Sequence, residues 1–249
     1  ASHERRIAEF IDYSLHLKLN PKARKMGPVS GGIDFVGFIV RPGYVLVRRR
    51  TLGNLKAKIQ TMRRELVQTR MQSIFYRFDR EAQQQHLAIL NSYLGHLKHG
   101  RCHKAILNLW QANPFLELYF RFEHGKVIDR FKALKRGQLT LRRQVNLVHR
   151  LFKSHVCLIQ VGCYFEIFGE HAPAMAEQLG LNLLHGWRGW QDACGFNQRR
   201  LPQVVKKCID NKISIAIICQ TGRESSFAKE RLPALVIEPQ SGVGLEPRQ

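Results

Sequence analysis

The chain has 249 residues, of which 44% are hydrophobic and 24% are charged. This composition is typical of a globular protein and excludes a disordered tail. No apolar run approaches the ~20 residues that cross a bilayer, and the first residues do not resemble a signal peptide. The six cysteines form no C-x-x-C pair, so we expect structural thiols in a reducing cytoplasm. The chain lacks an initiator Met, and we expect it to start inside a longer protein.

The net charge of +21 is concentrated in the first 150 residues. That part holds 29 Lys and Arg against 10 Asp and Glu, whereas residues 151–249 hold 11 against 9. Such an excess of like charge repels itself in a folded domain, so a nucleic acid is the expected partner of the basic part. The charge spans several predicted elements rather than one amphipathic helix, which disfavours a membrane surface as the partner.

The predicted elements begin with a helix, in which apolar residues recur at helical spacing over residues 4–17. Asn20-Pro21 breaks this pattern. Two β-branched and aromatic runs follow, at residues 33–40 and 44–47, on either side of Pro42-Gly43. They predict two strands joined as a hairpin.

Three helices are predicted next. The first is capped by Thr51 and has its apolar side at Leu52, Leu55, Ile59, Met62 and Leu66. The second opens at Asp79 and runs to about Leu97, and the third covers residues 104–110. Residues 115–122 alternate like a strand, Gly125 could turn a second hairpin, and a basic run follows to Arg143.

The last hundred residues alternate between strand and helix patterns. Strands are predicted at residues 156–161, 213–218 and 235–237, and helices at 165–179 and 201–209. This succession is typical of an α/β module.

Four blocks in the first 110 residues resemble the C-terminal part of bacterial reverse transcriptases, of the group II intron and diversity-generating types. In chain order they are Leu19-Asn20-Pro21-Lys22, Gly32-Ile33-Asp34-Phe35-Val36-Gly37-Phe38, Leu46-Val47-Arg48-Arg49-Arg50 and Asn91-Ser92-Tyr93-Leu94-Gly95-His96-Leu97-Lys98-His99. The resemblance implies a primer-grip hairpin at the edge of the palm, followed by a helical thumb. A polymerase holds its duplex by the backbone, which requires cations and close approach at glycines. The residues expected to contact nucleic acid here are Gly37, Phe38, Arg48, Arg49, Arg50, Lys56, Lys58, His96, Lys98, His99 and Arg101.

The chain itself is not expected to polymerise. Phosphoryl transfer needs paired carboxylates that hold two metal ions, and the family's paired-aspartate turn is absent from this sequence. We therefore expect no catalytic residue and no cofactor in this chain, with Mg²⁺ expected only alongside those missing carboxylates. The resemblance implies that Lys22 donates a proton to pyrophosphate, whereas a surface charge is the simpler interpretation of one lysine in this turn. The histidines at 96, 99 and 103 do not predict a zinc site, because Gly100 breaks the helix between them.

Residues from about 156 to 222 resemble the first domain of MutS, which meets the mismatched base. The resemblance is carried by Gln160-Val161-Gly162-Cys163-Tyr164-Phe165-Glu166-Ile167-Phe168, Leu179-Gly180-Leu181, Cys194-Gly195-Phe196 and Ile215-Ala216-Ile217-Ile218-Cys219-Gln220. It implies that Tyr164 stacks on an unpaired or distorted base and that Glu166 accepts or shares a proton there. Tyr164 stands where the family has Phe, and Cys163 where it has Asp. The alternative is that Tyr164 and Phe168 are core residues of a reused scaffold.

The predicted fold class is α+β, with a β-hairpin and a basic helical thumb bundle followed by a separate α/β module resembling MutS domain I. The predicted ranges are a palm edge at 1–50, a thumb at 51–112, a basic connector at 113–143, the MutS-like module at 144–240 and a tail at 241–249. The expected function is to grip an RNA–DNA hybrid or duplex DNA as part of a reverse transcriptase, while the MutS-like module contacts mismatched duplex. Two alternatives stay open, a module that docks an accessory protein subunit and a free-standing nucleic-acid-binding protein.

Overall fold

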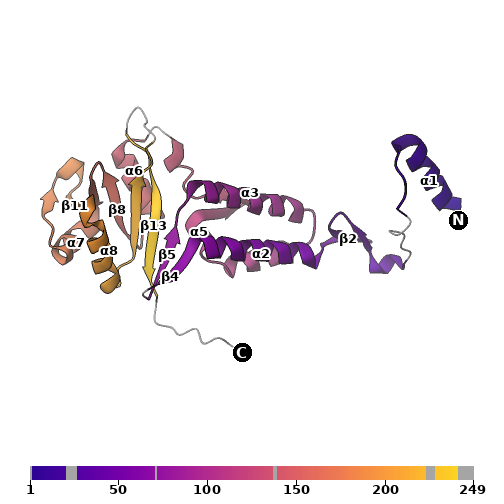
Figure 1. The fold of residues 1–249 in the computed structure, drawn as a ribbon, viewed down its shortest axis with the longest axis horizontal. Helices are drawn as coiled ribbons and strands as arrows, with labels where there is room; N and C mark the ends of the chain where they lie inside the picture. The colour runs from indigo at the N-terminus through magenta and orange to yellow at the C-terminus, as the bar shows by residue number, and fades with distance from the viewer. Residues whose placement is uncertain (1, 21–26, 71, 137–138, 223–227, 241–249) are drawn as a thin grey trace.

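The computed structural model describes residues 2–20, 27–70, 72–136, 139–222 and 228–240. The chain is elongated, with the first helix at one end and a large sheet at the other (Figure 1). This helix, α1 (Ser2–Leu15), confirms the helical pattern predicted from residue 4 onward, and its apolar side chains Ile7 and Phe10 are exposed. In the described ranges, no helix has the length and apolar character needed to cross a membrane.

A three-stranded antiparallel sheet comes next, formed by β1 (Ile33–Phe35), β2 (Phe38–Arg41) and β3 (Tyr44–Val47) after a short 3-10 turn, η2 (Val29–Gly31). The turn between β2 and β3 confirms the predicted hairpin. The prediction of one strand over residues 33–40 is wrong, because the chain reverses at Val36-Gly37. Both residues have positive φ, 45° and 89°, as a two-residue hairpin turn requires. Because Val36 is β-branched and apolar, the sequence pattern continues through this turn and does not indicate it.

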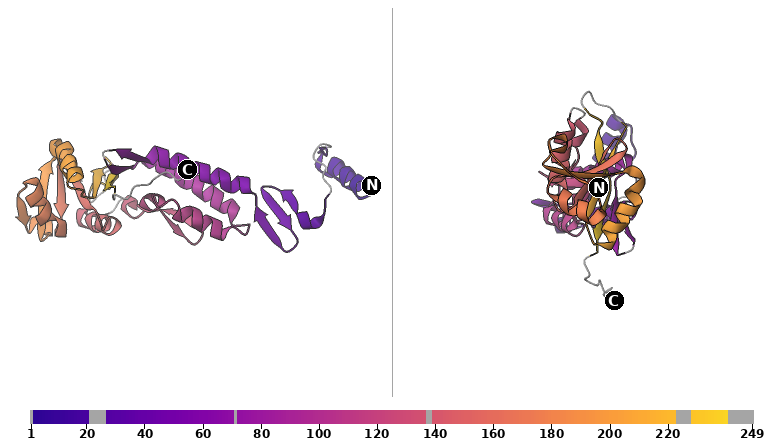
Figure 2. Two further views of the ribbon diagram at one scale, coloured as in Figure 1. Left: turned by 90° about the horizontal axis from the view of Figure 1, so that it is seen from below. Right: turned by 90° about the vertical axis from the view of Figure 1, so that its left-hand side faces the viewer.

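Two long helices, α2 (Arg49–Leu66) and α3 (Arg80–Leu97), extend from this small sheet along the axis of the molecule, and α4 (His103–Gln111) follows them (Figure 2). The three predicted helices are confirmed. Asp79 caps α3 as predicted, since its carboxylate accepts a hydrogen bond from the backbone N–H of Ala82 at 2.8 Å. The predicted cap of α2 is wrong: the helix starts at Arg49, so Thr51 lies within its first turn.

A hairpin between α2 and α3 is the main departure from the predicted all-helical thumb. It is formed by β4 (Val67–Arg70) and β5 (Ser73–Arg77). The aromatic and β-branched side chains of Ile74, Phe75 and Tyr76 favour a strand, but the run is too short to be read apart from the helical patterns around it.

The described part of the predicted connector folds onto the bundle. It contains α5 (Leu116–Tyr119), the hairpin of β6 (Phe120–Glu123) and β7 (Lys126–Asp129), and η3 (Leu134–Arg136). The hairpin turn at Gly125 confirms the second predicted hairpin. The strand pattern predicted over residues 115–122 is wrong in its first part, because residues 116–119 form α5 and the strand starts at Phe120. The amide of Asn91 on α3 bonds both the N–H and the C=O of Val127, at 3.0 and 2.9 Å. These bonds fasten the hairpin to the helix.

The large sheet has eight strands in the order β10-β11-β9-β8-β12-β13-β5-β4. Its C-terminal strands are β8 (Val156–Val161), β9 (Tyr164–Phe168), β10 (Leu183–His185), β11 (Asp192–Asn197), β12 (Ile215–Gln220) and β13 (Arg231–Pro239). β8 and β12 run parallel and the other neighbours are antiparallel. The predicted helix over residues 165–179 is wrong in its first part. Residues 164–168 instead form β9. Both faces of this strand are largely buried, so its sequence lacks the polar alternation by which a strand is recognised.

Helices cover both faces of this sheet. On one face α7 (Ala172–Leu179) and α8 (Leu201–Asp210) pack with Leu158 and Ile217. On the other face α6 (Leu141–Leu151) packs with Ile159. Three short 3-10 turns complete the module, η4 (Gly169–His171), η5 (Trp187–Gly189) and η6 (Gln198–Arg200).

The bundle and the C-terminal module share both their sheet and their core. β5 pairs with β13 from Ser73↔Pro239 to Arg77↔Leu235. One continuous apolar cluster joins buried residues of α2 and α3, such as Leu55 and Leu94, to Ile159 in β8. The α+β class is confirmed. The module that the sequence predicted as separate is joined to the bundle through this seam.

Candidate nucleic-acid interface

A cationic groove of about 480 Å³ lies between the three-stranded sheet and the starts of α2 and α4. Four arginines line it, and its floor is apolar. The full lining is Ile39, Arg41, Leu46, Val47, Arg48, Arg49, Leu52, Arg101, Cys102 and Ala105. The fold thus gathers three of the predicted contact residues, Arg48, Arg49 and Arg101, and adds Arg41, which sequence reasoning missed. The sequence feature that could have identified Arg41 is its position next to the predicted Pro-Gly turn, where it faces Tyr44 across a two-residue hairpin.

The arginines of the groove are held in place by neighbours on the small sheet. The Arg41 guanidinium donates to the Tyr44 hydroxyl at 3.0 Å, and that of Arg101 lies 5.5 Å from the centre of the Tyr44 ring. The Arg101 backbone N–H donates to Val45 O at 3.0 Å. Arg48 forms an ion pair with Asp34, which neutralises part of its charge. Arg41, Arg49 and Arg101 therefore contribute the larger share of positive potential.

Gly37 and Phe38 meet the end of α3. The Phe38 ring stacks on His96, with centroids 4.3 Å apart and planes at 28°. A Cβ built on Gly37 would lie 2.9 Å from His96 Nε2, and Gly37 O accepts from the Arg48 N–H at 3.1 Å. Gly37 thus permits close packing of the turn against His96, which fixes the small sheet to the bundle.

The other predicted cations divide among different sides of the bundle. Arg49, Lys56 and Arg63 recur every seven residues, so they lie along one side of α2 and extend the groove as a stripe. Lys58 lies roughly 200° around the helix from Lys56, and Arg50 about 100° from Arg49.

Two predicted contacts lie past the end of α3, and the predicted proton donor lies outside the described residues. Lys98 and His99 are exposed in the turn after this helix. Lys22 falls outside the described residues. Among the residues that the structure describes, no three His, Cys, Asp or Glu side chains lie close enough to hold a metal ion.

Tyr164 stands at the tip of the β8–β9 hairpin and is 49% exposed. The turn is Gly162-Cys163, with Gly162 at φ 65°, and the backbone N–H of Gln198 donates to Cys163 O at 2.8 Å. Gln198 opens the η6 turn, so the exposed Arg199 and Arg200 come next to this hairpin. Tyr164 is therefore an accessible aromatic side chain on a hairpin whose turn contacts the start of a dibasic segment. The dibasic pair was visible in the sequence, but its proximity to Tyr164 depends on the β9–β11 pairing.

Glu166, two residues further on the same face of β9, is 8% exposed. Its Oε2 lies 3.2 Å from Nε of Arg188. Burial raises the pKa of Glu166, while Arg188, a hydrogen bond from Trp187 and the charge of Arg231 act against this rise. The carboxylate is thus engaged by the loop that follows β10. Any proton sharing with a base requires a partner to enter this existing arrangement.

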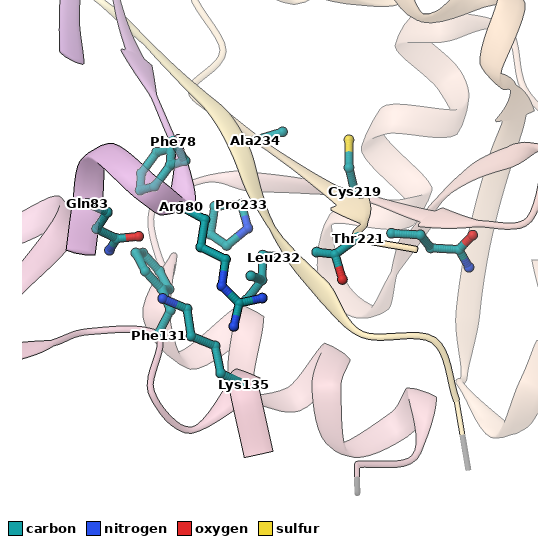
Figure 3. A pocket seen from close by; sticks show the side chains of 11 residues that line it. Phe78, Arg80, Gln83, Phe131, Lys135, Cys219, Thr221, Leu232, Pro233 and Ala234 are labelled. Carbon is teal, nitrogen blue, oxygen red and sulfur yellow. The ribbon is translucent and has the colours of Figure 1, made fainter. Parts of the chain in front are cut away.

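A second hollow, of about 360 Å³, lies where α3 meets the large sheet. Figure 3 shows the side chains of Arg80 and Lys135 reaching into it beside Phe78 and Phe131. Both cations are matched by carboxylates, Arg80 by Glu230 and Lys135 by Asp129. The balanced charge makes this hollow a weaker anion site than the arginine groove.

Comparison with protein families concerns the C-terminal part. Residues 140–236 match the family model of MutS domain I. The match runs from the start of α6 into β13, and it confirms the resemblance predicted for this part of the chain. No curated protein matches the chain. The resemblance of the first 110 residues to reverse transcriptases is untested by these comparisons and stays a prediction.

Proposed function

We propose that this chain grips a template–primer duplex with its basic part, while its MutS domain I-like module contacts distorted or mismatched base pairs in the same duplex. The parent protein in this proposal is an RNA-directed DNA polymerase, and the duplex is an RNA–DNA hybrid or duplex DNA.

The observation that carries the proposal is the arginine groove with its continuation along α2. Arg41, Arg49 and Arg101 meet over an apolar floor, and Lys56 and Arg63 continue from Arg49. A row of cations on a rigid helix contacts successive phosphates without reading base sequence.

The seam between β5 and β13 supports joint action of the two parts. It makes the bundle and the MutS-like module one body, so a duplex on the bundle has a fixed relation to Tyr164. The module has little excess charge, and the basic part supplies the general affinity for nucleic acid.

The test is fluorescence anisotropy with a labelled RNA–DNA hybrid over a range of salt concentrations. The double variant Arg49→Ala/Lys56→Ala should weaken binding irrespective of sequence and lower the slope of log K against log salt by roughly 2, about 0.9 for each lost phosphate contact.

The matched control is Lys206→Ala/Lys207→Ala, which removes the same charge from exposed positions of α8. It should leave the slope nearly unchanged. Equal losses in the two double variants would show that only total charge matters, and would contradict the groove as the binding surface.

A further inference from the structure

The loop between β10 and β11 carries two tryptophans in different surroundings. Trp190 packs inward, with its ring centre 5.5 Å from that of Phe168 and 5.9 Å from that of His149. Trp187 is 43% exposed. The first ring anchors the loop to the core, so the second is presented to solvent from a fixed base.

The backbone of this loop is tightly turned. The Gly186 N–H donates to Gln191 O at 3.0 Å, and the Trp190 N–H donates to Trp187 O at 2.9 Å. Arg188 has φ 51° and ψ 27°, a left-handed conformation that is costly for a residue with a side chain. Such a conformation persists where surrounding contacts hold it, and the side chain of Arg188 supplies such contacts.

Arg188 and Trp187 reach across β11 to Glu166. β11 lies between β10 and β9, and the residue of β11 in register with Glu166 is Gly195. A Cβ on Gly195 would lie 3.3 Å from Cγ of Glu166, so a side chain there would crowd this carboxylate. Across this gap, Nε of Arg188 comes within 3.2 Å of Oε2 of Glu166, and Cζ of Arg188 lies 5.3 Å from the centre of the Trp187 ring.

Tyr164 stands beside this arrangement. It lies on the same face of β9 as Glu166, about 7 Å along the strand. Trp187 belongs to the β10–β11 loop at the opposite end of β9 from Tyr164, and its side chain hydrogen-bonds the Glu166 carboxylate. Two exposed rings, Tyr164 and Trp187, thus lie near the ion pair between the buried Glu166 carboxylate and the exposed Arg188 guanidinium.

We propose that Tyr164 and Trp187 form a two-ring clamp for one nucleobase displaced from a duplex, with the Glu166–Arg188 pair as its polar floor. An unstacked base offers two apolar faces and a hydrogen-bonding edge. The rings suit the faces, and the floor offers both an acceptor and a donor for the edge. The proposal rests on the proposed function, because the bundle must deliver the duplex. It adds Trp187 and Arg188 to Tyr164 and Glu166, the two residues for which the resemblance to MutS implies a role at the base.

The experiment uses the full chain and two labelled RNA–DNA hybrids that differ by one unpaired base. Trp187→Ala should reduce the preference for the bulged over the matched hybrid roughly ten-fold, with affinity for the matched hybrid nearly unchanged. Trp187→Phe keeps a ring and should retain most of the preference. Trp110→Phe, a change in the bundle, is the control and should leave the preference unchanged.

Tryptophan fluorescence provides a second readout that does not depend on whether the alanine variant folds. The bulged hybrid should quench the emission of the wild-type chain more than the matched hybrid does, and this difference should vanish in Trp187→Phe. If Trp187→Ala binds both hybrids and prefers the bulged one as strongly as wild type does, the clamp is overturned and the grip of the bundle stands. Equal quenching of the wild-type chain by the two hybrids would have the same meaning. Failure of the wild-type chain to bind either hybrid would overturn the clamp together with the proposed function.

Discussion

The arginine groove and the Tyr164 site use charge in opposite ways. In the groove, four arginines line an apolar floor, and Arg41 and Arg101 are held by contacts with a tyrosine. At the Tyr164 site the buried Glu166 carboxylate forms an ion pair with Arg188, and the aromatic side chains of Tyr164 and Trp187 are exposed. Exposed cations give affinity that depends on salt and not on sequence, whereas aromatic rings distinguish a stacked from an unstacked base. One part of the chain is therefore suited to holding a duplex, and the other to inspecting its bases.

The two regions should unfold together, because they share one apolar core. Phe131 is 1% exposed and contacts both Phe78 of the bundle and Phe152 beside the large sheet, at 5.5 and 5.9 Å between ring centres. Phe131→Ala should lower the free energy of unfolding by about 3–5 kcal/mol, because it leaves a cavity between the two regions.

Urea denaturation of single-tryptophan variants measures this loss. Trp110 reports on the bundle and Trp190 on the sheet, and both should give the same midpoint before and after the change. Phe35→Ala, at a residue that is 64% exposed, is the control and should cost less than 1 kcal/mol. Two separate midpoints in the wild-type chain would show that the seam does not couple the regions.

Much of this architecture was accessible to sequence reasoning, and the reasons for the failures are specific. Helices with strong apolar periodicity, such as α2 and α3, were predicted because that period depends on local spacing. The β4–β5 hairpin was missed because its short strands gain stability from β13, some 160 residues away in the chain. β9 was read as helix because Phe165, Ile167 and Phe168 are buried on both faces and show no alternation.

The candidate sites show the same limit. Adjacent basic residues in the sequence, Arg48 and Arg49, were proposed as contacts and do line the groove. Arg188 and Trp187 were not singled out, because their proximity to Glu166 arises only when β10, β11 and β9 lie side by side. Clusters within one element can be seen in a sequence, whereas clusters across a sheet require its strand order.

The distance between the two regions sets the length of duplex that can contact both of them. α2 has 18 residues and rises about 27 Å, and the five strand spacings from β4 to β9 add roughly 24 Å in the same direction (Figure 1). At ~3.4 Å per base pair of duplex DNA, the start of α2 and Tyr164 are separated by about 15 base pairs. A hybrid is closer to A-form and needs a few more base pairs to span this distance.

Tyr164→Ala should therefore weaken binding of a 20-base-pair bulged hybrid several-fold and leave a 10-base-pair hybrid unaffected. A series of hybrids of increasing length, each titrated with wild type and variant, measures the onset. An effect of the same size at every length would mean that the two regions do not hold one duplex together.

The smallest expected effect concerns the pH dependence of the seam. Glu238 on β13 bonds His155 at 3.0 Å, and a hydrogen bond with Tyr76 of β5 also acts on its carboxylate. The bond with His155 is the largest cause that lowers the pKa of Glu238 below its ordinary value, and burial opposes it. A carboxyl group whose pKa is lower in the folded state stabilises the fold above its unfolded pKa, and this stability is lost as pH falls through the folded value.

The free energy of unfolding should thus decline on acidification below about pH 5, by less than the loss in Phe131→Ala. Glu238→Gln should flatten this part of the pH profile, because glutamine does not titrate. Urea midpoints measured between pH 7 and pH 4 compare the two proteins, and an equally steep decline in both would assign the acid sensitivity to other groups and leave the seam without a titrating contact.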